Sequence, residues 1–137
     1  YENDEVSFKD KVKDLTGGKG ADVIYDPVGG EVFDQSIRCI NWGGRLLIIG
    51  FAGGTIPTLP VNYPLIKGFS VVGVRAGEFG RRDPLLGREN IDIINSLAED
   101  NKIRPHICKI FDFIDSKKAL EFLENRELIG KVVIRIS

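Results

Sequence analysis

A chain of 137 residues is long enough to form one domain with a hydrophobic core, and its 42% hydrophobic and 28% charged residues are typical of a globular protein. The 19 basic and 20 acidic residues leave a net charge of -1, which gives no electrostatic reason to bind nucleic acid or anionic lipid. No apolar run approaches the roughly 20 residues of a membrane span. We therefore expect no nucleic-acid partner, no membrane partner, and a ligand bound at a specific site.

The first predicted element is a helix over residues 7–15. Ser7 is placed to cap it, and Phe8, Val12 and Leu15 share one face at spacings of four and three. Gly17-Gly18 would end this helix.

A strand, a helix and a second strand follow in close succession. Residues 21–26 form a short apolar run, residues 31–40 have helical periodicity, and residues 45–50 are almost uninterruptedly apolar, as in a strand buried on both faces. Such a βαβ unit has a right-handed crossover and places its helix on one face of a parallel sheet. The helix positions expected to face that sheet are Val32, Phe33, Ser36, Ile37 and Ile40.

The second half of the chain continues the alternation of helices and strands. In chain order the expected elements are a loop over 51–67, a strand over 69–74, a Gly- and Arg-rich loop over 75–88, a helix marked by Ile91, Ile94, Leu97 and Ala98, a strand over 107–113, a helix capped by Asp115 or Ser116, and a strand over 131–136. The fold class is therefore α/β.

The cysteines and the first residues indicate the setting of the chain. Cys39 and Cys108 lie far apart and form no CxxC pair, which favours free thiols in a cytoplasmic protein over a disulfide. The sequence contains no Met, opens with Tyr-Glu-Asn-Asp-Glu and shows no signal peptide. We interpret it as a segment of a longer chain.

Three blocks carry a resemblance to a known family. They are GADVIYDPVGG at 20–30, GGRLLIIGFAGG at 43–54 and GKVVI at 130–134. In this order and spacing they resemble the medium-chain dehydrogenase/reductase superfamily, in particular its zinc-free NADPH:quinone oxidoreductase branch. The resemblance covers essentially the whole chain. It implies the second half of a Rossmann-type doubly wound parallel sheet, with a C-terminal helix and strand.

The resemblance also implies which parts this segment lacks. No G-x-G-x-x-G phosphate loop occurs in the sequence, and Gly17-Gly18-Lys19-Gly20 ends a helix instead of opening one. Residues 1–137 would thus be the C-terminal portion of a nucleotide-binding domain, without the first Rossmann strands and the N-terminal catalytic domain of the family.

Ligands of doubly wound sheets lie outside the carboxyl ends of the strands, where glycines let the backbone approach a flat ring or a ribose. By similarity to the family, the turn after Gly50 and the residues near Val74 would line the nicotinamide end of NADPH or NADH, and Tyr1 would lie near the adenosine 2′-phosphate. The candidate cofactor-binding residues are Tyr1, Val28, Gly29, Phe51, Ala52, Gly53, Val74 and Arg75.

Several other polar residues have ordinary interpretations. Asp26 ends a strand, where capping of the next helix is favoured over contact with a ribose. His106 and Cys108 have too few partners for a zinc site, so we expect no metal. The arginines of the 75–88 loop could grip a phosphate or acidic substrate, but the interleaved acidic residues favour pairing within the loop.

The resemblance implies a parent enzyme that passes hydride from NADPH to a quinone or an enone-like carbonyl compound. No catalytic residue can be assigned here, and we expect the isolated chain to be inactive. The alternatives are a dimerisation or weak nucleotide-binding module without turnover, and part of another Rossmann-like enzyme such as a methyltransferase. Strand 69–74 has neither charge nor Pro, so we expect it to pair with a second copy as a homodimer.

Overall fold

The computed structural model describes residues 7–125 and 128–136. The chain divides into two compact units, Tyr1–Phe79 (unit 1) and Gly80–Ser137 (unit 2). Tyr1 lies outside the described residues.

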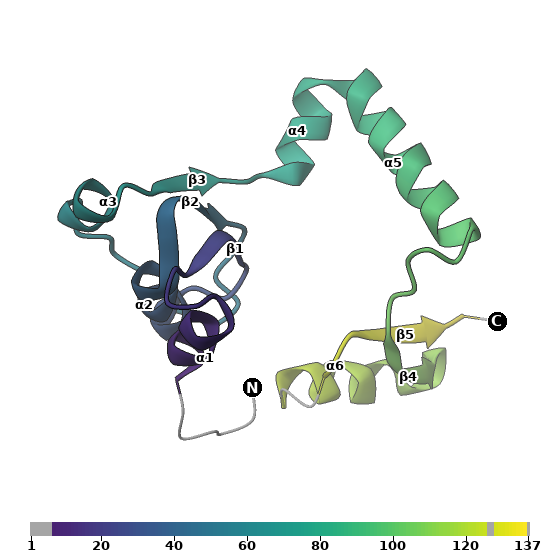
Figure 1. Ribbon diagram of the computed structural model, residues 1–137. Coiled ribbons are helices and arrows are strands. Elements are labelled where there is room, and N and C mark those ends of the chain that lie inside the picture. Colours follow the sequence, from purple (N-terminus) through teal and green to yellow (C-terminus); the bar gives the residue numbers. More distant parts are fainter. Residues whose placement is uncertain (1–6, 126–127, 137) are drawn as a thin grey trace. The chain divides into compact units, whose positions relative to one another are not determined.

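Unit 1 is built on a three-stranded parallel sheet in the order β1–β2–β3 (Figure 1). The strands are β1 (Ala21–Asp26), β2 (Ile40–Ile48) and β3 (Ser70–Gly73). Leu46 of β2 pairs with Ile24 on one side and with Val71 on the other. The predicted α/β class, the βαβ unit and the parallel pairing are confirmed. β2 begins five residues earlier than the periodicity predicts.

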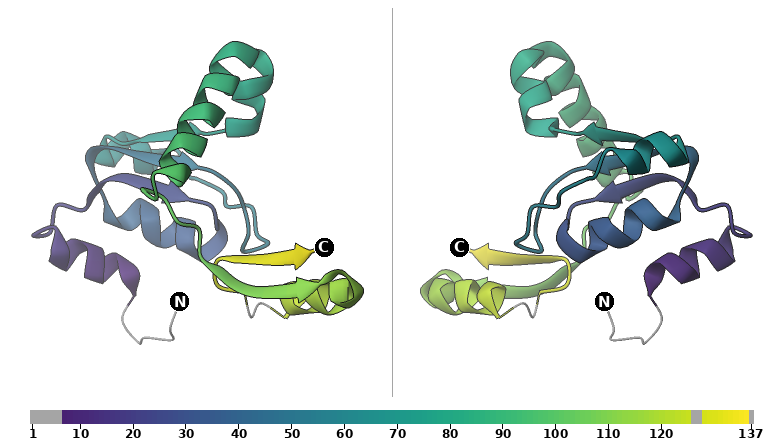
Figure 2. Two further views of the ribbon diagram at one scale, coloured as in Figure 1. Left: turned by 90° about the vertical axis from the view of Figure 1, so that its right-hand side faces the viewer. Right: turned by 90° about the vertical axis from the view of Figure 1, so that its left-hand side faces the viewer.

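Three helices accompany the sheet: α1 (Phe8–Leu15), α2 (Gly30–Cys39) and α3 (Asn62–Lys67). α1 and α2 lie on the same side of the sheet (Figure 2). Between α2 and the sheet lies a core of five buried side chains: Phe33, Ile37, Ile40, Leu46 and Phe69. Four partly buried side chains pack against this core: Ile24, Ile48, Leu59 and Tyr63. Of the inward face predicted for the helix, Phe33, Ser36 and Ile37 are buried as expected. Val32 is only half-buried, and Ile40 is buried as the first residue of β2 and not as part of the helix.

Lys67 joins the end of α3 to the end of α2. Its ammonium group donates hydrogen bonds to the carbonyl oxygens of Ile37 (2.8 Å) and Arg38 (3.0 Å). These are among the carbonyls at a helix C-terminus that have no partner inside the helix, and a cation is favourable there. Partial burial lowers the pKa of Lys67.

The second face of the sheet is not covered within unit 1. Val23 is 48% exposed and Tyr25 66% exposed, and their neighbours on β2 are Arg45 and Leu47. Arg45 is exposed and Leu47 half-buried, so burial of β2 on both faces is not found in this unit. The sequence prediction is wrong on this point because an apolar run does not show how many of its faces have a partner in the same unit.

Unit 2 contains a helix and a separate βαβ unit. α5 (Pro84–Glu99) is followed by β4 (Ile107–Asp112), the short 3-10 turn η1 (Phe113–Asp115), α6 (Ser116–Glu124) and β5 (Lys131–Arg135). β4 and β5 pair in parallel, and Ala119 of α6 is buried. These elements confirm the helix, strand, helix and strand predicted after residue 88, except that β4 ends at Asp112 and Phe113 begins the 3-10 turn.

Two predicted loops contain helices. α4 (Ala76–Arg82) and the first turns of α5 occupy the segment 75–88, and α3 lies within 51–67. Asp83 is the N-cap of α5, where its carboxylate accepts a hydrogen bond from the amide of Leu86 (3.0 Å), and Pro84 follows at the first helical position. Asp-Pro is a helix start signal that the glycines and arginines around it masked.

Within 7–125 and 128–136, no helix is both long enough and apolar enough to cross a membrane.

The two cysteines are both free but differ in environment. Cys39 is 1% exposed, and its burial raises the pKa of the thiol despite the opposing effect of Lys67, whereas Cys108 is half-buried. We expect a disulfide reagent to modify Cys108 first, and Cys39 only after denaturant is added, because the thiolate is the reactive form. Because burial of Cys39 favours the protonated thiol, this burial contributes fully to stability below the ordinary thiol pKa of 9.0, and the contribution declines as the pH rises above it.

The variant Cys108→Ser isolates the reaction of Cys39, and absorbance of the released thiolate measures its rate. Rapid modification of Cys39 in the folded Cys108→Ser protein would contradict the buried position.

Candidate functional site

The carboxyl ends of the three parallel strands of unit 1 lie at one edge of the sheet. Asp26, Ile48 and Gly73 form the last row of the ladder, Asp26 pairing with Ile48 and Ile48 with Gly73. The turns that follow these strands contain all the candidate cofactor-binding residues that the structure describes; they are Val28, Gly29, Phe51, Ala52, Gly53, Val74 and Arg75. Tyr1 cannot be placed, because it lies outside the described residues.

Asp26 shapes the turn between β1 and α2. Its side chain is only 2% exposed, and Oδ1 accepts hydrogen bonds from the amides of Val28 (2.8 Å) and Gly29 (2.9 Å). Capping of the next helix, the interpretation favoured by the sequence, is not what the structure shows, since the N-cap of α2 is Gly29 and no side-chain capping bond is made at the start of that helix. Asp26 instead forms an Asx turn within the loop.

The turns after β1 and β2 are joined by backbone hydrogen bonds. The amides of Ala52 and Gly53 donate to the carbonyls of Pro27 (3.0 Å) and Val28 (2.9 Å). The amide of Gly30 donates in turn to the carbonyl of Thr55 (3.1 Å). The structure therefore brings together the predicted segments 28–29 and 51–53. Thr55, which the sequence analysis did not single out, belongs to the same arrangement.

Gly29 is required at the contact between these two turns, here called the joint. Its φ is +72°, and a Cβ atom there would lie 3.0 Å from both the Phe51 ring and the carbonyl oxygen of Thr55. An L residue is strained by the backbone conformation and also crowded by the second turn. The sequence prediction that glycine permits close backbone approach holds here, although the approaching group is the chain's own turn.

Val74 and Arg75 continue the same edge of the sheet from β3. The amide of Val74 donates to the carbonyl of Ile48 (2.9 Å), and the carbonyl of Arg75 accepts from the amides of Glu78 and Phe79 at the start of α4 (3.1 Å each). Both side chains are exposed. Val74 thus lies beside the end of β2, next to the turn that carries Phe51.

The joined turns offer an apolar surface with backbone polar groups and few reactive side chains. Phe51 is 41% exposed and Val74 38% exposed, and Val28 is half-buried. An atom added at the Cβ position of Gly54 would meet nothing within 4 Å, so this turn is open to an approaching ring. The arrangement suits the binding of a flat, largely uncharged group.

The other residues considered from the sequence belong to other elements. Arg81, Arg82 and Arg88 lie on α4 and α5. In the described parts of the chain, no three His, Cys, Asp or Glu side chains are grouped closely enough to hold a metal ion. Gly17 and Gly18 end α1, as expected, with the amide of Gly18 donating to the carbonyl of Lys13 (2.7 Å).

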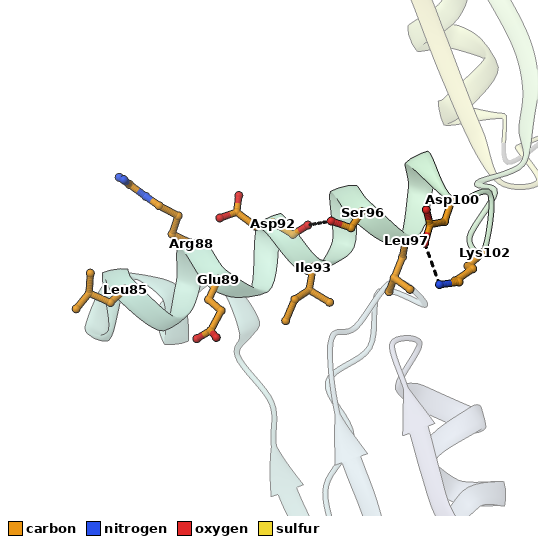
Figure 3. Close-up of a pocket in the computed structure, with 9 residues that line it drawn as sticks. All are labelled: Leu85, Arg88, Glu89, Asp92, Ile93, Ser96, Leu97, Asp100 and Lys102. Atoms are coloured by element: carbon orange, nitrogen blue, oxygen red, sulfur yellow. Dashed lines mark hydrogen bonds and ion pairs between the residues drawn. The ribbon is translucent and has the colours of Figure 1, made fainter.

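A groove of about 510 Å³ runs along α5 in unit 2 (Figure 3). Its lining includes Leu85, Ile93 and Leu97, and it comes entirely from this helix and the turn after it. Ser96 donates to the carbonyl of Asp92 (3.0 Å), and Lys102 pairs with Asp100 (2.9 Å). The groove contains none of the candidate cofactor-binding residues, and one helix surface gives it little enclosure.

Comparison with known proteins identifies the family. Residues 1–88 match the zinc-binding dehydrogenases. The chain belongs to this family, within the medium-chain dehydrogenase/reductase superfamily. The matched segment contains the sheet of unit 1 and all three strand-end turns.

The individual relatives and solved structures similar to this chain include quinone oxidoreductase-like proteins and an alcohol dehydrogenase. A quinone oxidoreductase-like protein 2 homolog from Nematostella vectensis is 41% identical over 129 residues, 93% of this chain and 35% of the relative. The quinone oxidoreductase-like protein 2 of Rattus norvegicus is 33% identical over 95% of this chain and 37% of its own length. The solved structure of an NAD-dependent alcohol dehydrogenase is 27% identical, with a TM-score of 0.77 over 94% of this chain and 35% of that one. The chain thus spans about a third of the length of these relatives.

The joint between the turns can be tested by substitution at Gly29. We expect Gly29→Ala to lower the free energy of unfolding by about 2 kcal/mol, because positive φ and crowding act together. Gly73→Ala is the matched control, since a Cβ there meets nothing within 4 Å and its φ is not positive. Urea unfolding followed by the fluorescence of the single tryptophan, Trp42, measures both variants. Equal stability of the two variants would contradict the joint.

Proposed function

We propose that this chain is the cofactor-binding portion of an oxidoreductase that transfers hydride from NADPH to a quinone or an enone-like carbonyl compound. The observation that carries the proposal is the convergence of the turns after β1, β2 and β3 at one edge of a parallel sheet, where ligands of such sheets bind. Family membership and the quinone oxidoreductase-like relatives support the reaction class.

A nicotinamide cofactor is supported by the chemistry of the turns and by the NAD-dependent relative of known structure. The cofactor would supply the hydride chemistry, while the protein binds it, orients it and excludes water. Phe51 and Val74 would provide apolar contacts to a flat ring. The carbonyl oxygens of the exposed residues Ala52 and Gly53 would provide polar ones, since their amides already donate to the carbonyls of Pro27 and Val28. Arg75 is exposed at the same edge, where its guanidinium is available to an anionic group.

The proposal assigns the remaining parts of such an enzyme to residues other than these 137. No G-x-G-x-x-G loop is present among the 137 residues, and the chain corresponds to about a third of its relatives. We assign the phosphate loop, the first Rossmann strands and the catalytic domain to that other part, so the isolated chain would not turn over substrate. Two free cysteines support a cytoplasmic location.

Titration of the ¹⁵N-labelled chain with NADPH tests the site. We expect weak, millimolar binding because the phosphate loop is absent, with amide shifts concentrated at 28–29, 51–53 and 74–75. NADH and adenosine serve as comparison ligands for the nicotinamide end. Ala52→Glu should weaken binding about tenfold by placing a carboxylate in the turn, whereas Ala98→Glu on exposed α5 should not.

No saturable shift at these turns, or shifts confined to the groove of α5, would refute the proposed site. Micromolar binding would instead favour the second candidate function, a nucleotide-binding module that works without the rest of the enzyme.

A homodimer through β3 is a separate part of the proposal. β3 is an edge strand, and Val71 and Val72 are each 38% exposed. An unpaired edge without charge or proline is a template for another strand, so we expect two copies to pair here. Light scattering should then give twice the chain mass of 15.2 kDa.

Val71→Lys should convert that dimer to a monomer, because a charged edge resists strand pairing. Ile66→Lys, at a 70% exposed position on α3, is the control and should remain dimeric. If the unaltered chain is a monomer at micromolar concentration, the proposed homodimer is refuted.

A further inference from the structure

The turn after β1 contains the backbone groups from which anion sites are often made. In doubly wound sheets, amides between a strand and the following helix commonly point at a phosphate, and the helix N-terminus adds a partial positive charge. Here the amides of Val28 and Gly29 both point at Asp26 Oδ1, at 2.8 and 2.9 Å. A carboxylate of the chain itself occupies the position that an external anion would take.

The next amide is occupied as well. Gly30 at the start of α2 donates to the carbonyl of Thr55 (3.1 Å), so three successive amides have acceptors inside unit 1. Asp26 is 2% exposed and Gly29 is buried, which keeps water from competing for these hydrogen bonds. The amides of Val28, Gly29 and Gly30 are therefore not free to bind phosphate, and the carboxylate beside them gives an unfavourable charge.

We propose that Asp26 is an internal anion that closes the β1–α2 turn to phosphate and holds it against the 51–55 turn. Asp26 is thus a positioning residue, and it determines which part of a nucleotide this edge accepts. An uncharged ribose or nicotinamide ring fits the apolar surface of Val28 and Phe51, whereas a pyrophosphate is repelled. The assignment of the ring and ribose rests on the proposed cofactor-binding function; the closure to phosphate does not.

Three variants separate this role from simple stabilisation. Asp26→Ala removes the acceptor and its charge. Asp26→Asn keeps an oxygen that can accept both amides. Asp22→Ala is the matched control, since Asp22 lies on the same strand, is exposed, and accepts a hydrogen bond from the Asn41 side chain (2.7 Å) instead of from the turn amides.

Inorganic pyrophosphate is the probe, and the amide shifts of Val28 and Gly29 are the readout. We expect no saturable shift for the unaltered chain, Asp26→Asn or Asp22→Ala. Asp26→Ala should bind pyrophosphate at least about tenfold more tightly, because two donors become available and a repelling charge is removed. Rescue of the original behaviour by the Asn variant is an outcome that a general loss of stability would not produce.

Saturable binding of pyrophosphate at these amides in the unaltered chain or in Asp26→Asn overturns the inference, as does a folded Asp26→Ala that gains no binding. Trp42 fluorescence establishes whether Asp26→Ala is folded. If it is not, the unaltered chain and Asp26→Asn still test the inference, since saturable pyrophosphate binding by either one overturns it. NADPH titrations of the same proteins keep the two proposals apart. Absence of NADPH binding with the expected pyrophosphate results removes the proposed function alone.

Discussion

The parallel pairing of β2 with a strand on each side is the constraint on which unit 1 depends. Parallel strands cannot be joined by tight turns, so α2 must cross from β1 to β2, and a longer connection must lead from β2 to β3. The same pairing sends all three strand ends to one edge. The hydrophobic core follows from it, since Leu46, which pairs with a residue on each neighbouring strand, is fully buried in the cluster that includes Phe33 and Ile37 of α2. Site and core are thus two results of one arrangement.

Much of this arrangement could be predicted from local patterns. Alternation of β runs with helical periodicity indicates a parallel sheet, and a parallel sheet indicates where its turns gather. The helices in 75–88 were missed because Gly80 and Gly87 suggest a loop. In the structure a Cβ on Gly87 would lie 2.7 Å from the Cα of Gly80, so these glycines permit close packing of two helical segments. Such a reason is visible only once the segments are placed together.

The candidate site likewise has features that the sequence predicts and features that only the structure shows. The glycines and apolar residues of the turns could be identified because they follow strands directly in the sequence. The interactions that join the turns could not, since Gly30 and Thr55 are 25 positions apart and contact through backbone atoms, which have no signature in side-chain identity. Asp26 was noticed as a strand-end carboxylate, but its role depends on how the backbone bends after it. Backbone geometry, more than side-chain chemistry, therefore defines this site.

Unit 2 buries fewer hydrophobic side chains than unit 1. Among its described residues, Ala119 is the one fully buried hydrophobic side chain, while Ile110, Phe113 and Leu120 are each more than half exposed. With so little apolar area removed from water, the β4–β5 pairing has little to hold it closed. Within this chain, local opening of the β4–α6–β5 unit should cost far less free energy than global unfolding of unit 1. Backbone amides of the two units would then exchange with deuterium at well-separated rates, as two cooperative blocks of unequal stability.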